Sequence, residues 1–289
     1  MNWQIKITAK LILARLPICY DFWKKVGLFK HGSMESPDYI YKIFWMHLNR
    51  AFPEGLPPGS VVLEMGSGDS VASCLLSKSL GASSYHIDVG AFATRDIESY
   101  KRIATDFVAK QNNIPDLSSA STLEELLEIC DAKYMTEGLS SLKTIPSNSV
   151  DFIWSHSVLE HVRKHEVEAT LNELNRILKP SGYRSHNIDF QDHLDKSLNN
   201  LRFSDSFWES EIVANSGFYT NRIPAIEMHK MFRTAGFEVV KEEFGQWSTL
   251  PISRRLIHKD FSRFKDAELS YCTSHILVKS PRLKSKVES

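Results

Sequence analysis

The sequence shows no excess of charge of either sign, few cysteines and no cysteine spacing that would bind a metal. Lysine and arginine together number 35, as do aspartate and glutamate, so no overall positive charge favours a nucleic-acid partner. The cysteines are scattered at positions 19, 74, 130 and 272, without a Cys-x-x-Cys pair or a Cys/His metal spacing. This pattern predicts plain reduced thiols in a cytoplasmic protein that does not bind nucleic acid.

The first residues also lack a long apolar run. Lysines precede a short apolar segment at residues 11–14, which Arg15 and Pro17 then interrupt. A membrane-spanning helix needs about 20 apolar residues, so we expect a helical cap over residues 1–59 instead. A peripheral membrane contact through the first helix of this cap is a minor alternative. Prolines and glycines at positions 53–59 separate the cap from the chain that follows.

The rest of the chain alternates strands with helices, and 42% of the whole sequence is apolar, enough for a buried core. The clearest unit is an apolar strand at 61–65, a turn containing Gly66 and Gly68, and an amphipathic helix over 71–80. Further strands are expected at residues 84–89, 133–135, 149–154, 183–188, 237–240 and 270–278. This alternation predicts a doubly wound α/β fold, with a mostly parallel sheet and a ligand crevice at the carboxyl ends of its strands.

Two classes of ligand use a strand, a glycine turn and a helix with an acid at the end of the next strand. A dinucleotide site has the pattern Gly-x-Gly-x-x-Gly, whose third glycine would fall at Val71. S-adenosylmethionine has no pyrophosphate, so the turn would face an amino acid and a ribose instead. The acid is Asp88, and a carboxylate accepts the two hydrogen bonds that a ribose diol offers. Val71 makes an NAD-dependent oxidoreductase the weaker interpretation.

Four segments in order resemble the class I S-adenosylmethionine-dependent methyltransferases, in the group of small bacterial enzymes with a Leu-Glu-His segment after the fourth strand. The segments are the first motif, the acid motif, the fourth-strand motif and the turn before strand five, at residues 63–68, 86–88, 145–162 and 176–183. The resemblance covers residues 60–280 and implies a seven-stranded Rossmann-like domain with S-adenosylmethionine as cofactor. The inserted lid at residues 190–224 lies outside the family pattern, and we expect residues 281–289 to be a flexible tail.

The resemblance also implies which residues bind the cofactor, namely Glu64, Gly66, Gly68, Asp88, Gly138, Leu139, Ser155 and His156. The two glycines of the turn would approach the methionine part of the cofactor, and Glu64 would either orient this loop or reach the amino group. Asp88 would take the ribose hydroxyls, and the pair at 138–139 lies where the family contacts adenine. One departure from the family pattern is Ser70, which stands where a third glycine is usual.

Methyl transfer from a sulfonium is an in-line displacement, and an alcohol acceptor also needs a general base. Histidine and aspartate are concentrated after the fifth strand, where His186, Asp189 and His193 are the candidate catalytic residues. Three interpretations stay open for them: a His–Asp base, a divalent-metal site that binds a sugar diol, and a hydrated loop. If the strand runs on to Ile188, alternation places His186 and Asp189 on opposite faces. His161, in the Leu-Glu-His segment, is expected to be structural.

Arginines, amides and aromatic rings interleave over residues 198–222, which suits a polyhydroxylated ligand or, alternatively, a seam between domains. With the N-terminal cap, this stretch resembles stand-alone methyltransferases that accompany surface-polysaccharide enzymes. The sequence therefore predicts methyl transfer to a small-molecule or glycan acceptor, at oxygen, in surface-polysaccharide or secondary metabolism. The alternative is a cofactor-binding or scaffold protein of a biosynthetic complex, without transfer activity.

Overall fold

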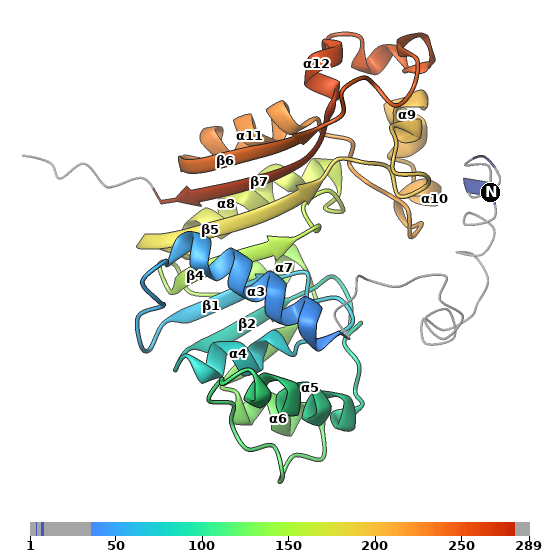
Figure 1. The fold of residues 1–289 in the computed structure, drawn as a ribbon. Helices are drawn as coiled ribbons and strands as arrows, with labels where there is room; N and C mark the ends of the chain where they lie inside the picture. Colours follow the sequence, from blue (N-terminus) through green and yellow to red (C-terminus); the bar gives the residue numbers. More distant parts are fainter. Residues whose placement is uncertain (1–3, 5–6, 9–35, 281–289) are drawn as a thin grey trace, which may run out of the picture.

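The computed structural model describes residues 4, 7, 8 and 36–280 (Figure 1). The expected helices before residue 36 and the expected tail at 281–289 lie outside these residues, as does the first helix with its membrane contact. Within the described part of the chain, no helix is long and apolar enough to cross a membrane.

A seven-stranded sheet forms the centre of the protein, with the strand order β3-β2-β1-β4-β5-β7-β6. The first five strands in sequence are parallel to one another, and β7 is antiparallel to both β5 and β6. The strands are β1 (Val61–Met65), β2 (Ser83–Ile87), β3 (Ala132–Met135), β4 (Val150–His156), β5 (Leu178–Asp189), β6 (Glu238–Gln246) and β7 (Tyr271–Lys279). The predicted mostly parallel sheet of a Rossmann-like methyltransferase fold is confirmed.

Helices cover both faces of this sheet, because buried strands present alternate residues to opposite sides (Figure 1). In β1, Val62 belongs to one buried cluster and Leu63 to the other. The first face carries α3 (Pro37–Ala51), α4 (Ser73–Ser79), α5 (Ile97–Ala109) and α6 (Leu123–Ile129). The second face carries α7 (Leu139–Thr144), α8 (Val167–Ile177) and α11 (Ala225–Thr234).

Helix α3 packs into the core instead of standing apart from it as part of a separate cap. Its start is encoded locally, because Ser36 caps the helix and a proline occupies its first turn. Its apolar face is buried against the sheet, and the ring of Phe44 meets that of Trp154 on β4 edge to face, with centroids 6.2 Å apart. The expected boundary at residue 59 therefore does not separate α3 from the sheet domain.

Two insertions lie beyond the carboxyl end of β5, near the same end of the sheet (Figure 1). The predicted lid contains the short helices η2 (Asn199–Arg202), α9 (Asp205–Trp208) and α10 (Glu211–Ala214), around a small core that includes Trp208 and Phe218. The second insertion, between β6 and β7, contains η3 (Arg254–Leu256), η4 (Lys259–Phe261) and α12 (Asp266–Leu269). The remaining element, η1 (Lys164–Glu166), leads into α8.

Candidate active site

The glycine turn after β1 has a backbone that other residues do not readily adopt. Gly66 and Gly68 have φ angles of +80° and +60°, in the left-handed region. The Gly66 N–H donates to the carbonyl of Ile87 over 2.7 Å, so the turn is pinned to the end of β2. A Cβ at position 66 would lie only 2.2 Å from the Val158 side chain, which follows β4. The turn is therefore held between the carboxyl ends of two strands.

Asp88 lies beside this turn, immediately after β2. One of its carboxylate oxygens accepts a hydrogen bond of 2.9 Å from the Gly68 N–H, and the other accepts one of 2.8 Å from the Val89 N–H. The structure thus brings together the two motifs that were expected to share one ligand, although they are 20 residues apart. A carboxylate fixed here is placed to meet a ribose beside the turn.

The proposed adenine segment adjoins the same acid. The Gly138 N–H donates to the Asp88 carbonyl over 2.8 Å, and Leu139 then begins α7. Gly138 has a φ of +52°, and a Cβ there would lie 3.0 Å from the Val89 side chain. The residues proposed for the methionine, ribose and adenine parts therefore form one continuous edge along β1, β2 and α7.

Glu64 is buried beneath the turn and is 2% exposed. Its carboxylate accepts a hydrogen bond from the Ser73 hydroxyl of α4, and the same oxygen lies 3.1 Å from Nδ1 of His86 on β2. Both contacts join neighbouring elements below the loop. Of the two expected roles, they favour orienting the loop over reaching the cofactor.

Ser155 and His156 end β4 but point to opposite faces of the sheet. The Ser155 hydroxyl lies 2.7 Å from Nδ1 of His186, on the face covered by α8 and α11. His156 lies on the α3 face, where its Nδ1 is 3.2 Å from Nε2 of His47 and its ring meets Tyr39 edge to face. Of the two, His156 keeps part of its surface exposed at the carboxyl end of the sheet.

His186 does not face the crevice, so the expectation that it does is wrong. It is fully buried, with its ring 5.4 Å from that of Phe232 on α11. The cause is the length of β5, which runs through Asp189 and turns the two side chains to opposite faces. Burial, reinforced by the nearby Arg184 and His275, holds the pKa of His186 well below its usual value.

Asp189 and His193 lie near a buried carboxyl group, that of Glu160 in the Leu-Glu-His segment. One Glu160 oxygen accepts a hydrogen bond of 3.2 Å from the Asp189 N–H. Its other oxygen is buried and has no hydrogen-bond partner in the described structure. Burial raises the pKa of Glu160 well above its usual value and also raises that of Asp189, so both carboxyl groups are easier to protonate than exposed ones.

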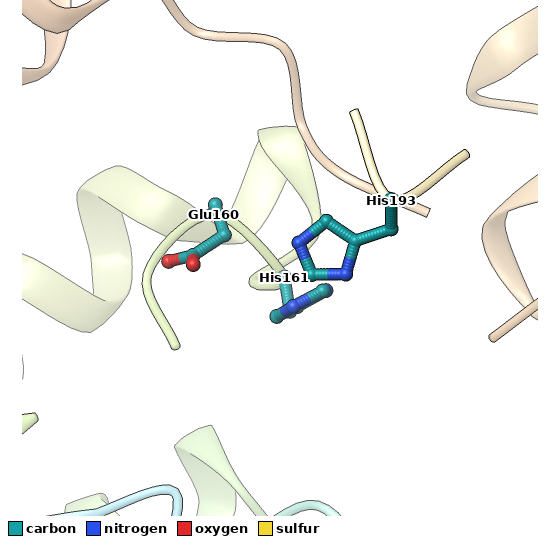
Figure 2. A group of neighbouring side chains, drawn as sticks. All are labelled: Glu160, His161 and His193. Carbon is teal, nitrogen blue, oxygen red and sulfur yellow. The ribbon is translucent and has the colours of Figure 1, made fainter. Parts of the chain in front are cut away.

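Ligand atoms of Glu160, His161 and His193 all lie within 4.8 Å of one another, close enough to be considered as a metal site. Figure 2 shows, however, that the Glu160 carboxylate points away from the two imidazole rings, which meet edge to face with centroids 4.7 Å apart. Zinc binds imidazole nitrogen at about 2.0–2.1 Å, so the ligand atoms of a zinc site must lie closer to one another than the 4.8 Å within which these three lie.

His161 instead ties the lid to the domain, as its expected structural role requires. Its Nδ1 donates to the Tyr219 carbonyl over 2.8 Å. The buried Asn221 amide of the lid donates to the carbonyls of Leu159 and Val162, over 2.8 and 3.0 Å. The guanidinium of Arg222 likewise donates to lid carbonyls and to Asp205. These polar groups hold the lid in place. They therefore fit the interpretation of residues 198–222 as a seam between domains better than the interpretation as a surface that binds a polyhydroxylated ligand.

A small pocket remains between the lid, the end of β5 and the second insertion. Polar and apolar residues line it, including Glu160, Asp189, Asn200 and Tyr271. One carboxylate oxygen of Glu160 and the amide oxygen of Asn200 are buried without a hydrogen-bond partner in the described structure, and both residues line this pocket. Because buried oxygens are normally hydrogen-bonded, this pocket suits a water molecule or a hydroxyl group of a ligand.

Sequence reasoning missed two residues that contact the site from the α3 face, His47 and His275. The signal for His47 is its position on α3 among the buried Phe44, Ile43 and Leu48, where a polar residue needs a partner. No comparable signal marks His275, because its partners come from distant parts of the chain.

Residues 63–185 match a family model described as a methyltransferase domain. No curated protein is matched by the sequence. Among solved structures, an S-adenosylmethionine-dependent methyltransferase from Methanosarcina mazei is 18% identical, with a TM-score of 0.48 over 79% of this chain and 96% of that one. Phosphoethanolamine N-methyltransferase 2 from Haemonchus contortus is 12% identical, with a TM-score of 0.48 over 92% of this chain and 61% of that one. Geranyl diphosphate C-methyltransferase from Streptomyces coelicolor is 12% identical, with a TM-score of 0.47 over 83% and 78%.

Proposed function

We propose that the chain is a class I S-adenosylmethionine-dependent methyltransferase, since its residues 63–185 match a methyltransferase domain model, and that it methylates a hydroxyl oxygen of a small-molecule or glycan acceptor. The observation that carries the choice of oxygen is an imidazole at the carboxyl end of β4. His156 Nδ1 lies 3.2 Å from Nε2 of His47, and when this Nδ1 carries the proton, Nε2 of His156 is left as an acceptor. A hydroxyl group must lose its proton during methylation, and a neutral imidazole can take it.

The cofactor would lie along the edge formed by the glycine turn, Asp88 and Gly138. The methionine part would approach the backbone of Gly66 and Gly68, which have no side chain of their own, and the ribose hydroxyls would bond to the Asp88 carboxylate. In this arrangement, the sulfonium methyl group would face the end of β4. His156 would then be beside the acceptor, and the domain itself would mainly position the two reactants and exclude water.

The acceptor would enter between the end of β5 and the lid. Asp189 and His193 remain candidates for contacting it, because Asp189 ends β5 and His193 follows it at this end of the sheet. The pocket lined by Glu160 and Asn200 has two unpaired oxygens that would each accept or share a hydrogen bond with an acceptor hydroxyl. We also propose a cytoplasmic location, from the scattered cysteines, and a role in surface-polysaccharide or secondary metabolism, from the resemblance of residues 198–222 to stand-alone methyltransferases that accompany surface-polysaccharide enzymes.

Cofactor binding is tested by calorimetry with S-adenosylhomocysteine on the wild type and on Asp88→Ala. Loss of the two hydrogen bonds from the ribose to a charged group should weaken binding by about 30-fold or more. Asp116→Ala removes an exposed aspartate that bonds only within its own turn and should bind as the wild type does. Equal affinity of Asp88→Ala and Asp116→Ala would exclude Asp88 as the ribose ligand.

The acceptor is sought with tritiated S-adenosylmethionine on lysate fractions, followed by mass analysis of the labelled product. A methyl ether or ester in the product supports transfer to oxygen, and a methylated nitrogen or carbon contradicts it. The second candidate, a cofactor-binding scaffold, is favoured by the lid, whose amides and Arg222 are bonded within the protein. It gains if S-adenosylhomocysteine binds while no fraction is ever labelled.

A further inference from the structure

A continuous chain of hydrogen bonds crosses the α3 face of the sheet and joins three histidines through one serine. Nδ1 of His156 on β4 lies 3.2 Å from Nε2 of His47 on α3. Nδ1 of His47 lies 2.8 Å from the hydroxyl of Ser185 on β5, and that hydroxyl lies 2.8 Å from Nε2 of His275 on β7. The four residues come from four different elements, and all but His156 are buried.

The chemistry of these groups allows only two arrangements of protons along the chain. Ser185 has one hydroxyl proton, so it donates to one imidazole and accepts from the other. If it donates to His275, then His47 carries its proton on Nδ1 and must accept at Nε2 from Nδ1–H of His156. If it donates to His47 instead, every proton moves to Nε2. All three histidines therefore share one tautomer, Nδ1–H in the first arrangement and Nε2–H in the second.

The protonation states suit such a chain, because all three imidazoles are neutral at pH 7. Burial lowers the pKa of His156 and of His275 to about 4 each. Burial, assisted by the neighbouring histidines and Arg50, holds the pKa of His47 well below its usual value. Each link thus connects one donor with one acceptor, without an ionised group in the interior.

The two ends of the chain differ in what surrounds them. His156 is the last residue of β4. The residue before it, Ser155, pairs with Met65, which ends β1 immediately before the glycine turn. His275 lies on β7 opposite Glu243 of β6, where the Glu243 carboxylate, Arg50 and Lys241 form exposed ion pairs. One end therefore meets the proposed reaction centre, and the other approaches the solvated edge of the sheet.

We propose that this chain is a proton relay, in which His156 takes the proton of the acceptor hydroxyl and His47, Ser185 and His275 pass it towards solvent. The inference rests on the proposed transfer to oxygen. His156 is the catalytic base in it, and the other three are positioning residues that act through His156.

The proton balance of one turnover follows from the first arrangement. The acceptor oxygen forms a bond to the methyl carbon while the carbon–sulfur bond breaks, and the sulfonium becomes the neutral thioether of S-adenosylhomocysteine. The hydroxyl proton goes to Nε2 of His156, whose Nδ1 proton passes to His47. The Nδ1 proton of His47 passes to Ser185, the serine proton passes to Nε2 of His275, and Nδ1 of His275 releases a proton to water. After the product leaves, His156 gives its Nε2 proton to water and a solvent proton enters at His275, which restores the chain.

The relay predicts a spectroscopic property that needs no acceptor. In protein with ¹⁵N-labelled histidine, two-bond proton–nitrogen spectra at pH 7.5 with bound S-adenosylhomocysteine should show one common tautomer for His47, His156 and His275. Ser185→Ala should allow His275 to adopt a tautomer different from that of His47 and His156. Ser274→Ala is the matched control. It removes a buried serine hydroxyl of β7 that lies 2.9 Å from Nε2 of His229, and it should leave the tautomers of His47, His156 and His275 unchanged. Mixed tautomers in the wild type would overturn the relay.

Activity supplies the second measurement, once tritiated cofactor labels a lysate fraction. Ser185→Ala should slow labelling by about 10- to 100-fold, within the range of a lost proton-transfer path, and Ser185→Thr should restore it. Affinity for S-adenosylhomocysteine should stay within about twofold in both variants, because Ser185 does not contact the glycine turn or Asp88. An unchanged rate in Ser185→Ala would also overturn the relay. If no fraction is labelled at all, the proposed oxygen transfer fails, while the tautomers still decide whether the chain is continuous.

Discussion

The cofactor half and the acceptor half of this protein are built in different ways. In the cofactor half, the site is mostly backbone: a glycine turn, an acid held by two N–H groups, and a glycine at the start of α7. In the acceptor half, it consists of side chains from distant segments, such as His161 with Tyr219 and Glu160 with Asp189. A short motif can specify the first kind of site, whereas the second exists only once the lid and the sheet have packed together.

The largest effect should come from filling the glycine turn. Gly66→Ala would place a methyl group 2.2 Å from Val158 as well as straining a backbone with φ of +80°. We expect it to lower the free energy of unfolding by about 3 kcal/mol and to abolish S-adenosylhomocysteine binding. Thermal unfolding and calorimetry measure both.

Gly59→Ala is the control that separates backbone strain from the steric clash with Val158. Its φ is +74°, yet no atom lies within 4 Å of the added Cβ. We expect this control to cost only about 1 kcal/mol and to bind the cofactor product normally. Equal losses in the two variants would show that Val158 does not press against the turn.

The next largest effect should come from detaching the lid. Asn221→Ala would leave the buried carbonyls of Leu159 and Val162 without the amide that now bonds to both. We expect a loss of about 2–3 kcal/mol in the free energy of unfolding, with little change in S-adenosylhomocysteine affinity. The control is Asn215→Ala, whose amide bonds to Glu211 at the surface, and urea unfolding should show it near wild type. Strong loss of cofactor affinity in Asn221→Ala would contradict the division into two halves.

The relay histidines should make the α3 face sensitive to acid. Burial lowers the pKa of His156 and of His275 to about 4, against roughly 6.5 in an unfolded chain. Between these values the unfolded chain binds more protons, so their stabilisation is complete above about pH 6.5 and is lost as the pH falls.

We expect this loss to reach roughly 2 kcal/mol by pH 5 for the pair, after allowance for their partial exposure. Melting curves of the wild type and of His156→Gln/His275→Gln at pH 7.5 and 5 measure it as the difference between the two proteins. His165→Gln, at an exposed position in η1, should follow the wild type. A wild type that gains stability on acidification relative to the double variant would reverse the sign and refute the assignment.

The same division explains how far the sequence alone could lead. The strands, the glycine turn and Asp88 could be predicted because each is encoded within a few consecutive residues, and α3 because its cap and apolar face are local. The bonds of Ser185 to His47 and to His275 could not, because they join residues 138 and 90 positions apart. His186 was misplaced for a related reason: its direction depends on where β5 ends, and strand ends are weakly encoded.

Glu160 gives the smallest expected effect and a direct comparison between the halves, because it is a buried acid with an unpartnered oxygen, whereas both oxygens of Asp88 accept hydrogen bonds from backbone N–H groups. Burial raises the pKa of Glu160 well above its usual value. Its stabilising contribution is therefore complete at low pH and is lost as the pH rises through the range between the unfolded and the folded pKa.

A glutamine has nearly the same shape as the protonated acid, can accept the same hydrogen bond from Asp189, and cannot ionise. Glu160→Gln should thus be within about 1 kcal/mol of the wild type at pH 5 and more stable than it at pH 9. In the cofactor half, Asp88→Asn should instead weaken S-adenosylhomocysteine at both pH values, because an amide has one acceptor oxygen where the carboxylate has two. Melting curves that stay parallel between pH 5 and 9 would mean that Glu160 is ionised in the folded protein, and the acceptor half would then hold a charged carboxylate as well.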